Sequence, residues 1–346
     1  VDVDDYTTDS RSAHRRIAWQ IRLYDIVIFT NPLGRQAVPA LPVSCGAADL
    51  IPHHALVLRA NGRVDVDAAR VGVVSVLVED QLARRLGDKF GVIGRLIGKY
   101  YEYLEMRAAC LSNRVVVIAK SFRAALETKF GIAPNKIEVI ENWAPLDEIN
   151  VGSKRNPWSA AHDLAGCEVV LYTGTLGMKH NPAQLVTLAE TLKGKRNTRV
   201  VVISEGPSAE WLKTSAKEKS LDNLMVLPFQ PYAQYPDVLA TADVLVAMIE
   251  NDSGEYSVPS KLLSYLSAGC SIVLSAPEEN LAAEIIERSG AGISGRPGDT
   301  VAFVTSVERL LADASMRQEL GRKARAYAEN TFDIRRIGQR FEALLK

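Results

Sequence analysis

The sequence lacks the features that mark several common classes of protein. It has four cysteines in 346 residues, none spaced as C-x-x-C, so neither a zinc site nor a disulfide framework is indicated. No apolar run approaches the roughly 18 residues that a membrane span needs. The 41 basic residues are balanced by 41 acidic ones, which argues against nucleic acid as a partner. With no signal-peptide pattern visible, we expect a cytoplasmic protein.

Histidine is also scarce. The five histidines form no helical pair at metal-ligand spacing, and the adjacent His53 and His54 must point in different directions. We therefore expect no metal and no bound cofactor.

What the sequence does contain is enough apolar residues to build cores, at 47% hydrophobic and 24% charged. Runs rich in valine and isoleucine alternate with helical patterns such as Pro182–Leu192 and Leu281–Arg288. Continuous apolar runs of this kind are typical of parallel strands covered on both faces, so the sequence predicts a doubly wound α/β protein. The expected strands are Asp25–Thr30, Val71–Val78, Arg114–Ala119, Lys136–Ile140, Glu168–Thr173, Arg199–Ser204, Asn223–Leu227, Asp243–Met248 and Ser271–Leu274.

A break in this pattern falls at Asn142–Trp158, which contains two prolines and a glycine and predicts a linker. We expect a Rossmann-like domain over residues 1–150 and a second one over 151–346, with helices at the C-terminal end that include Phe332–Lys346.

The first candidate site is the loop from Gly174 to Lys179, which contains Thr175 and Gly177 and follows the strand Glu168–Thr173. Ligands of open α/β sheets bind beyond the carboxyl ends of the strands. Glycines allow backbone N–H groups to approach a phosphate, and a lysine adds a positive charge. An ordinary strand-to-helix turn is the alternative.

A second candidate is the start of the helix after Pro259. Ser260 and Lys261 lie where free N–H groups and the helix dipole attract anions, so a diphosphate could bind there. An ordinary capped helix is the alternative.

Three further places carry weaker signals. Glu205 and Gly206 follow one expected strand, and the segment Phe229–Tyr232, with Gln230, follows another and could hold a nucleobase. Glu79 and Asp80 end the expected strand Val71–Val78, where one carboxylate could act on an acceptor hydroxyl. Plain loops, and a helix cap at Asp80, are the alternatives.

The stretch from Arg84 to Tyr103 mixes basic residues with large apolar ones. It could be a membrane-surface patch, or a solvated helix with one face on the core. The basic residues are Arg84, Arg85, Lys89, Arg95 and Lys99.

The order of these motifs resembles the bacterial family 4 glycosyltransferases of the GT-B fold that build exopolysaccharide, capsule or O-antigen. The matching segments are YTGTLGMKHNP (172–182), VVISEG (201–206), NLMVLPFQPY (223–232), ADVLVAMIE (242–250), SVPSKLLSYLSAGCSIVLS (257–275) and ARAYAENTFDI (324–334), with weaker matches at 104–126 and 136–145.

The resemblance implies two Rossmann-like domains whose parallel sheets face each other across a cleft, the second of which binds a nucleoside diphosphate sugar. By matching position, the resemblance implies that the donor phosphates are bound by Gly174, Thr175, Gly177, Lys179, Ser260 and Lys261. It implies that the nucleotide is bound by Glu205, Gly206, Phe229, Gln230 and Tyr232.

The sequence departs from the family in two respects. Where many members have two glutamates eight residues apart, this chain has Tyr256 and Ser264, with Glu255 one residue away as a substitute. We keep Ser264 as a nucleotide contact and Glu255, with Glu79 and Asp80, as a catalytic candidate. The first β-α unit is not recognisable, and we expect that the N-terminal domain lacks it.

The resulting hypothesis is metal-independent transfer of a sugar, with retention of configuration, to a saccharide or polyprenyl-linked acceptor, with peripheral association at the inner face of the plasma membrane. A non-hydrolysing nucleotide-sugar 2-epimerase and a non-catalytic nucleotide-sugar-binding subunit remain as alternatives.

Overall fold

The computed structural model describes residues 56–58, 71–73, 78–177, 180–249 and 260–344. The chain divides into two compact units, which are taken one at a time below. The first unit is Val1–Asn142 together with Arg335–Lys346, and the second is Trp143–Ile334.

The first unit contains a four-stranded sheet in the order β1-β2-β3-β4. Strands β2, β3 and β4 are parallel, and β1 pairs antiparallel with β2. The elements are β1 (Leu56–Leu58), β2 (Val71–Val73), α2 (Val78–Leu111), β3 (Arg114–Val117), α3 (Lys120–Phe130), the short 3-10 helix η2 (Pro134–Lys136), β4 (Ile137–Val139) and α12 (Ile334–Leu344). The expected strand Asp25–Thr30 lies outside the described residues.

The C-terminal helix α12 packs on this first sheet. Ile337 is buried against Val116 and Ile140, and Phe341 and Leu344 pack on the same cluster. The division therefore differs from the expected domains, 1–150 and 151–346, in two ways. The boundary falls after Asn142, and the last residues of the chain lie with the first unit because the apolar side of α12 is buried there.

The predicted strand Val71–Val78 is wrong at its last residue. Strand β2 covers Val71–Val73, residues 74–77 lie outside the described residues, and helix α2 already begins at Val78. Glu79 and Asp80 therefore lie in the first turn of a helix and not at the end of a strand. Acidic side chains are stabilising at a helix N-terminus, which favours this arrangement. The apolar run alone does not distinguish a strand from the start of a helix.

The second unit contains a six-stranded sheet, all parallel, in the order β10-β9-β8-β5-β6-β7. Its strands are β5 (Glu168–Thr173), β6 (Thr198–Ile203), β7 (Leu224–Leu227), β8 (Val244–Met248), β9 (Ser271–Ser275) and β10 (Gly292–Gly295). Every residue of β8 and β9 is buried, as the continuous apolar runs predict for strands covered on both faces.

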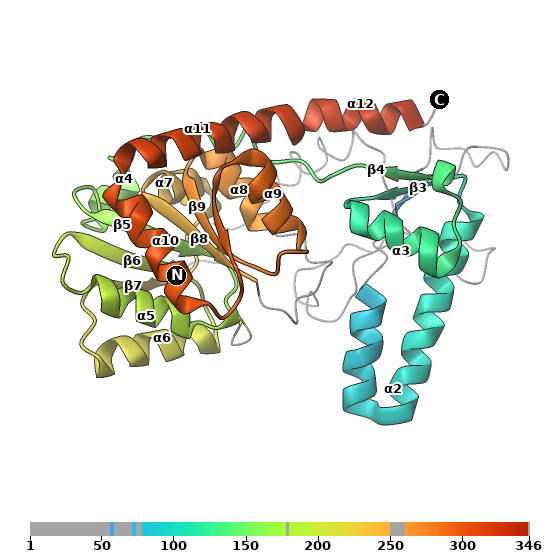
Figure 1. The fold of residues 1–346 in the computed structure, drawn as a ribbon, viewed down its shortest axis with the longest axis horizontal. Coiled ribbons are helices and arrows are strands. Elements are labelled where there is room, and N and C mark those ends of the chain that lie inside the picture. Colours follow the sequence, from blue (N-terminus) through green and yellow to red (C-terminus); the bar gives the residue numbers. More distant parts are fainter. Residues whose placement is uncertain (1–55, 59–70, 74–77, 178–179, 250–259, 345–346) are drawn as a thin grey trace, which may run out of the picture. The chain divides into compact units, whose positions relative to one another are not determined.

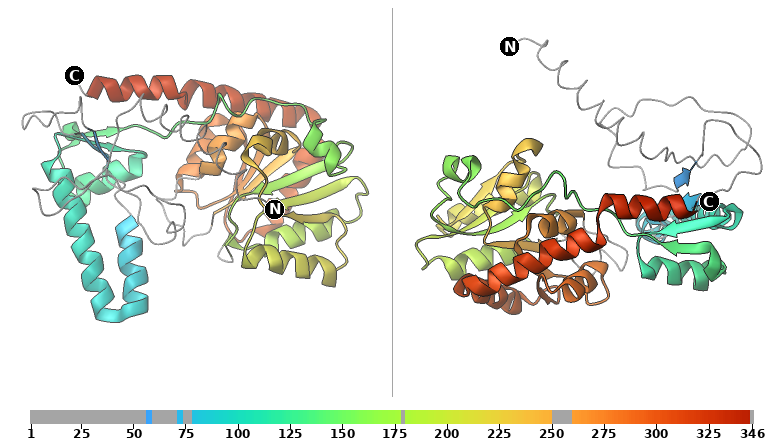
Figure 2. Two further views of the ribbon diagram at one scale, coloured as in Figure 1. Left: turned by 180° about the vertical axis from the view of Figure 1, so that it is seen from behind. Right: turned by 90° about the horizontal axis from the view of Figure 1, so that it is seen from above.

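Helices cover both faces of this sheet (Figures 1 and 2): α5 and α6 pack on one face and α8 and α9 on the other. The helices are α4 (Pro157–Ala161), α5 (Ala183–Leu192), α6 (Pro207–Glu218), α7 (Tyr235–Ala240), α8 (Ser260–Ala268), α9 (Leu281–Ser289), α10 (Thr300–Ala312) and α11 (Ala314–Thr331), with the 3-10 helix η4 (Tyr232–Gln234) before α7. The expected helices Pro182–Leu192 and Leu281–Arg288 are confirmed as α5 and α9.

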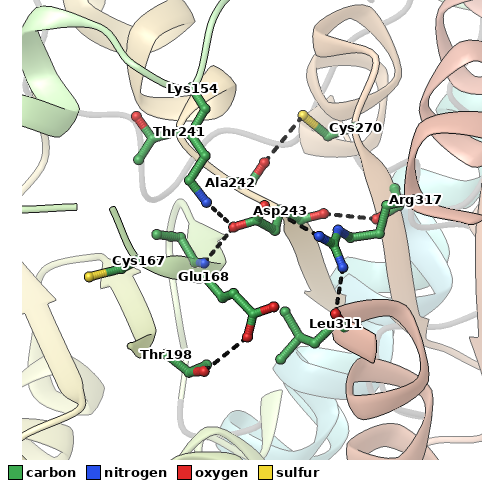
Figure 3. A network of polar contacts seen from close by, with 12 residues as sticks. Lys154, Cys167, Glu168, Thr198, Thr241, Ala242, Asp243, Cys270, Leu311 and Arg317 are labelled. Atoms are coloured by element: carbon green, nitrogen blue, oxygen red, sulfur yellow. Dashed lines mark hydrogen bonds and ion pairs between the residues drawn. The ribbon is translucent and has the colours of Figure 1, made fainter. Parts of the chain in front are cut away.

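A partly buried polar network connects the amino ends of the central strands (Figure 3). The carboxylate of Asp243, just before β8, accepts hydrogen bonds from Lys154 Nζ and from the backbone N–H of Val169 in β5, at 2.7 Å for the latter. Arg317 of α11 lies 3.9 Å from the same carboxylate and donates to the carbonyl oxygens of Leu310 and Leu311. This network holds β5, β8 and α11 together and leaves the carboxyl ends of the strands for other groups.

Candidate functional site

The strand order of the second unit locates a place where ligands bind in open α/β sheets. The chain runs outward from β5 through β6 to β7, and then returns to the other side of β5 to form β8, β9 and β10. Such a reversal between two central strands opens a crevice at their carboxyl ends. The loop that follows β5 and the first turn of α8 meet here.

Gly174 follows β5 in a conformation that favours glycine. Its φ is +110°, and its N–H donates a 3.0 Å hydrogen bond to the carbonyl oxygen of Ile203 in β6. A Cβ at this position would lie 3.5 Å from both Cε and Nζ of Lys261. The two segments predicted separately as phosphate sites are therefore in contact at Gly174 and Lys261.

Lys261 lies in the first turn of α8 and is partly buried. Its ammonium group donates a 2.7 Å hydrogen bond to the hydroxyl oxygen of Tyr172 and lies 4.2 Å from the centroid of that ring. Burial lowers its pKa from 10.5 to about 8. No carboxylate among the described residues pairs with this lysine, so an anionic ligand would supply the missing counter-charge.

Three tyrosines that the sequence analysis did not single out support this arrangement. Tyr172 Oη donates to the carbonyl oxygen of Thr175 at 2.9 Å, and Tyr265 Oη accepts from the backbone N–H of Thr173 at 3.1 Å. Tyr235 Oη lies 3.2 Å from Thr173 Oγ1 and is also hydrogen-bonded to Ser264. Burial raises the pKa of all three phenols, so they act as neutral hydrogen-bonding groups. They fix the backbone of the loop that follows β5.

The next loops along the same edge bring two other predicted segments together. The Glu205 carboxylate accepts a 3.0 Å hydrogen bond from the N–H of Phe229. Gly206, with φ of +95°, is the N-cap of α6. The ring of Phe229 is exposed. This corner therefore offers an aromatic face beside a carboxylate, which suits a nucleoside.

Gln230 and Tyr232 are engaged with other parts of the second unit. The Gln230 amide oxygen accepts from Trp158 Nε1 at 3.0 Å, and its amide nitrogen donates to the carbonyl oxygen of Pro228 at 2.8 Å. Tyr232 donates a hydrogen bond to the Glu148 carboxylate. Partial burial, as the larger cause, and this hydrogen bond together raise the pKa of Tyr232 to about 12. These contacts position the loop, and the Tyr232 ring remains exposed.

Three buried polar side chains at this edge have no hydrogen-bond partner among the described residues: Gln184 in the first turn of α5, Ser204 after β6 and Ser275 at the end of β9. Buried polar groups are rarely left unpaired in native proteins. Their concentration at the carboxyl ends of the strands is consistent with a polar ligand or ordered water at this edge.

The remaining predicted residues are placed as follows. The carbonyl oxygen of Gly177 accepts a 2.9 Å hydrogen bond from the N–H of His180. Ser260 is the first residue of α8 and is exposed. Lys179 and Glu255 lie outside the described residues. Glu79 and Asp80 belong to α2 in the first unit.

Within the described ranges, no group of three or more histidine, cysteine, aspartate or glutamate side chains is arranged to hold a metal ion. In the same part of the chain, none of the helices combines the length and the apolar character that crossing a membrane requires.

A family model described as "Glycosyl transferases group 1" matches residues 155–327, half of the chain and the part that contains the site just described. The chain belongs to this family. The α/β fold of this group 1 glycosyl transferase, with its parallel six-stranded sheet, agrees with the resemblance drawn from the motifs, and the family assignment is confirmed.

Relatives of this group 1 glycosyl transferase are distant in sequence. It is 22% identical over 218 residues to the putative colanic acid biosynthesis glycosyl transferase WcaI of Escherichia coli strain K12, an alignment covering 61% of this chain and 52% of that protein. The chain thus spans about half the length of the curated relative it matches.

Solved glycosyltransferases share its fold. The Anabaena protein HepE in complex with UDP superposes with a TM-score of 0.61 at 14% identity, covering 70% of this chain and 66% of that one. WaaG, described as a glycosyltransferase involved in lipopolysaccharide biosynthesis, gives 0.58 at 16% identity over 76% and 72% of the two chains.

Proposed function

We propose that this chain transfers a sugar from a nucleoside diphosphate sugar to an acceptor hydroxyl, and that its second unit binds the donor. The observation that carries this proposal is the partly buried ammonium group of Lys261, which faces the Gly174 backbone at the carboxyl edge of the sheet with no carboxylate partner among the described residues. A diphosphate satisfies this cation with two negative groups.

The donor phosphates are assigned to the loop after β5 and to the start of α8. Backbone N–H groups can approach closely at the glycines, and the dipole of α8 adds to the charge of Lys261. The assigned residues are Gly174, Thr175, Gly177, Lys179, Ser260 and Lys261.

The nucleoside is assigned to the neighbouring corner. Glu205 and Gly206 approach the ribose, the exposed rings of Phe229 and Tyr232 approach the base, and Gln230 shapes the loop between them. Ser264 lies near through its hydrogen bond to Tyr235. HepE was solved with UDP, so a uridine diphosphate sugar is the first donor to test.

The chemistry requires a leaving group that carries away negative charge. The bond between the sugar carbon and the diphosphate oxygen breaks, the diphosphate keeps the electron pair, and the acceptor oxygen forms the new bond while losing its proton. Lys261 and the α8 dipole stabilise the departing diphosphate without a metal. Glu79, Asp80 and Glu255 remain candidates for the proton and sugar contacts, and retention of configuration follows the family resemblance.

The acceptor is proposed to be a saccharide or a polyprenyl-linked saccharide in the synthesis of a cell-surface polysaccharide or glycolipid. The names of two similar proteins, concerned with colanic acid and lipopolysaccharide, support this class. Work on such an acceptor would place the protein in the cytoplasm, at the inner face of the plasma membrane.

A thermal-shift screen against uridine, guanosine, cytidine and adenosine diphosphates tests donor binding first. A ligand that binds only the folded state raises the melting temperature, and we expect one base to stand out. The matching radiolabelled nucleotide sugar is then incubated with a lipid-linked acceptor, with and without EDTA.

Transfer that survives EDTA supports the proposal. Conversion of the donor to an epimer without acceptor would instead identify a nucleotide-sugar epimerase, and binding without any turnover would identify a binding subunit.

A further inference from the structure

Helix α2 of the first unit is a hairpin of two helical arms. The arms run side by side in opposite directions (Figures 1 and 2) and are joined at Gly91, whose φ of 59° and ψ of −130° break the helix. At the base of the hairpin, Glu102 forms a 2.6 Å ion pair with Lys129 of α3. The hairpin is thereby tied to its own unit, and its tip extends away from that base.

The second arm exposes a continuous apolar stripe. Val92, Ile93 and Leu96 are 65%, 68% and 63% exposed. Ile97, Tyr100 and Tyr103 are also exposed. At about 100° per residue, these six positions fall within an arc of ~140°. This is the geometry of one helix face and not of scattered surface residues.

The opposite face of the same arm is made of small residues. Gly94 and Gly98, one turn apart, are buried although their neighbours are exposed. The first arm is the element that runs alongside (Figure 1), so the two arms approach each other through the glycine face. A helix arm that has small residues on the side of its neighbour and large apolar residues outside is arranged like a helix packed in lipid, the reverse of a water-soluble helix.

The charges near the tip are predominantly positive. Arg95 and Lys99 are exposed and flank one edge of the apolar stripe, and no acidic residue occurs from Gly91 to Tyr101. The first arm adds Arg84, Arg85 and Lys89 in sequence, and Asp88 is the one acid from Gln81 to Phe90. An apolar stripe with basic residues along its edge matches helices that lie in the interface of an anionic membrane.

We propose that the α2 hairpin docks the protein on the surface of an anionic lipid bilayer, with Val92, Ile93 and Leu96 entering the boundary between headgroups and acyl chains. Tyr100 and Tyr103 then lie at headgroup level, where aromatic rings with a polar end are favoured. Arg95 and Lys99 meet lipid phosphates. Contact with a second copy of the hairpin would instead bring like charges together.

This inference deepens the membrane part of the proposed function and rests on it for its biological purpose. It has a separate readout, because the hairpin belongs to the first unit and the donor residues to the second. A protein that binds vesicles but no nucleotide would retain the docking proposal and lose the donor proposal.

The test is flotation of the full chain with vesicles of phosphatidylcholine alone or with a third of phosphatidylglycerol. The variant Val92→Ser/Ile93→Ser/Leu96→Ser removes the apolar contact, and Arg95→Gln/Lys99→Gln removes two charges. Trp211→Ser/Val301→Ser changes exposed apolar residues of the second unit and serves as the matched control. Melting curves establish that each variant is folded.

We expect the wild type and the control to float with anionic vesicles at low salt and to be released as salt rises. The triple serine variant should stay at the bottom, and the double glutamine variant should bind on the order of tenfold more weakly. The proposal is overturned if the wild type ignores anionic vesicles, if the triple variant floats like the wild type, or if the hairpin mediates a dimer that shows no affinity for vesicles.

Discussion

Lys261 Nζ lies 2.7 Å from the Tyr172 hydroxyl oxygen and 4.2 Å from the centroid of the Tyr172 ring. The lysine thus contacts the end of strand β5, just before the glycine loop and 89 residues away in sequence. Its charge is held by a hydroxyl oxygen and by a π face, neither of which neutralises it. A cation in this setting is better explained by binding of an anion than by a contribution to folding.

This view predicts opposite effects of removing two lysines of the second unit. Lys261→Met should raise the free energy of unfolding of the ligand-free protein by about 1 kcal/mol, because a partly buried, unpaired charge is replaced by an apolar group of similar length. Lys154→Met should lower it by about 1–3 kcal/mol, because Asp243 loses its lysine partner. Urea denaturation measures both, and a loss of stability in Lys261→Met as large as that in Lys154→Met would show that Lys261 serves the fold.

The lowered pKa of Lys261 predicts how donor affinity depends on pH. The protonated form binds the diphosphate, so affinity should be full below pH about 8 and fall as pH rises through that value. The stability of the ligand-free protein depends on pH in the opposite direction. Since the folded pKa lies below the unfolded value of 10.5, unfolding takes up a proton between these pH values, and this group makes the fold more stable as pH rises.

Calorimetric titrations with UDP from pH 6.5 to 9.5 measure the affinity profile. Lys261→Met provides the control, since its weaker binding should lose the step near pH 8. A step of the same size in this variant would assign the titration to another group.

A third prediction concerns the glycine after β5. Gly174→Ala should lower stability because φ is +110°, and it should lower UDP affinity because the added methyl group, 3.5 Å from Cε and Nζ of Lys261, would occupy the space beside the ammonium group that a phosphate needs. The strain of such a φ is about 1–3 kcal/mol. Gly298→Ala, at φ of +80° with no atom within 4 Å of the new Cβ, is the matched control and should lose stability alone. Equal UDP affinity in the two variants would contradict a phosphate role for this loop.

The sequence predicted most of the second unit because its strands are buried on both faces and therefore have continuous runs of valine and isoleucine. Strand β10 was missed because Gly292–Gly295 has no such run. The strand forms by pairing with β9. Gly292 passes so close to β9 that a Cβ at this position would lie 2.0 Å from the carbonyl oxygen of Ile272. Its presence depends on a neighbouring strand and not on its own residues.

The candidate site was predicted in part for a similar reason. Glycine loops and helix starts are local patterns, so Gly174 and Lys261 could be recognised. The supporting hydroxyls of Tyr172, Tyr235 and Tyr265 could not, because their partners are brought together only by the strand order. Glu79 and Asp80 were assigned to a strand end because an apolar run was read past Val73 into the start of α2.

The measurement that tests the central claim most directly is calorimetric titration of the selected nucleoside diphosphate into wild type, Lys261→Met and Lys154→Met at pH 7. The account predicts binding to the wild type and to Lys154→Met with similar affinity. Lys261→Met should bind about tenfold to a hundredfold more weakly, as expected for loss of a charge-assisted contact of roughly 1.5–3 kcal/mol. Unchanged affinity in Lys261→Met, or an equal loss in Lys154→Met, would contradict a diphosphate site at the meeting point of Gly174 and Lys261.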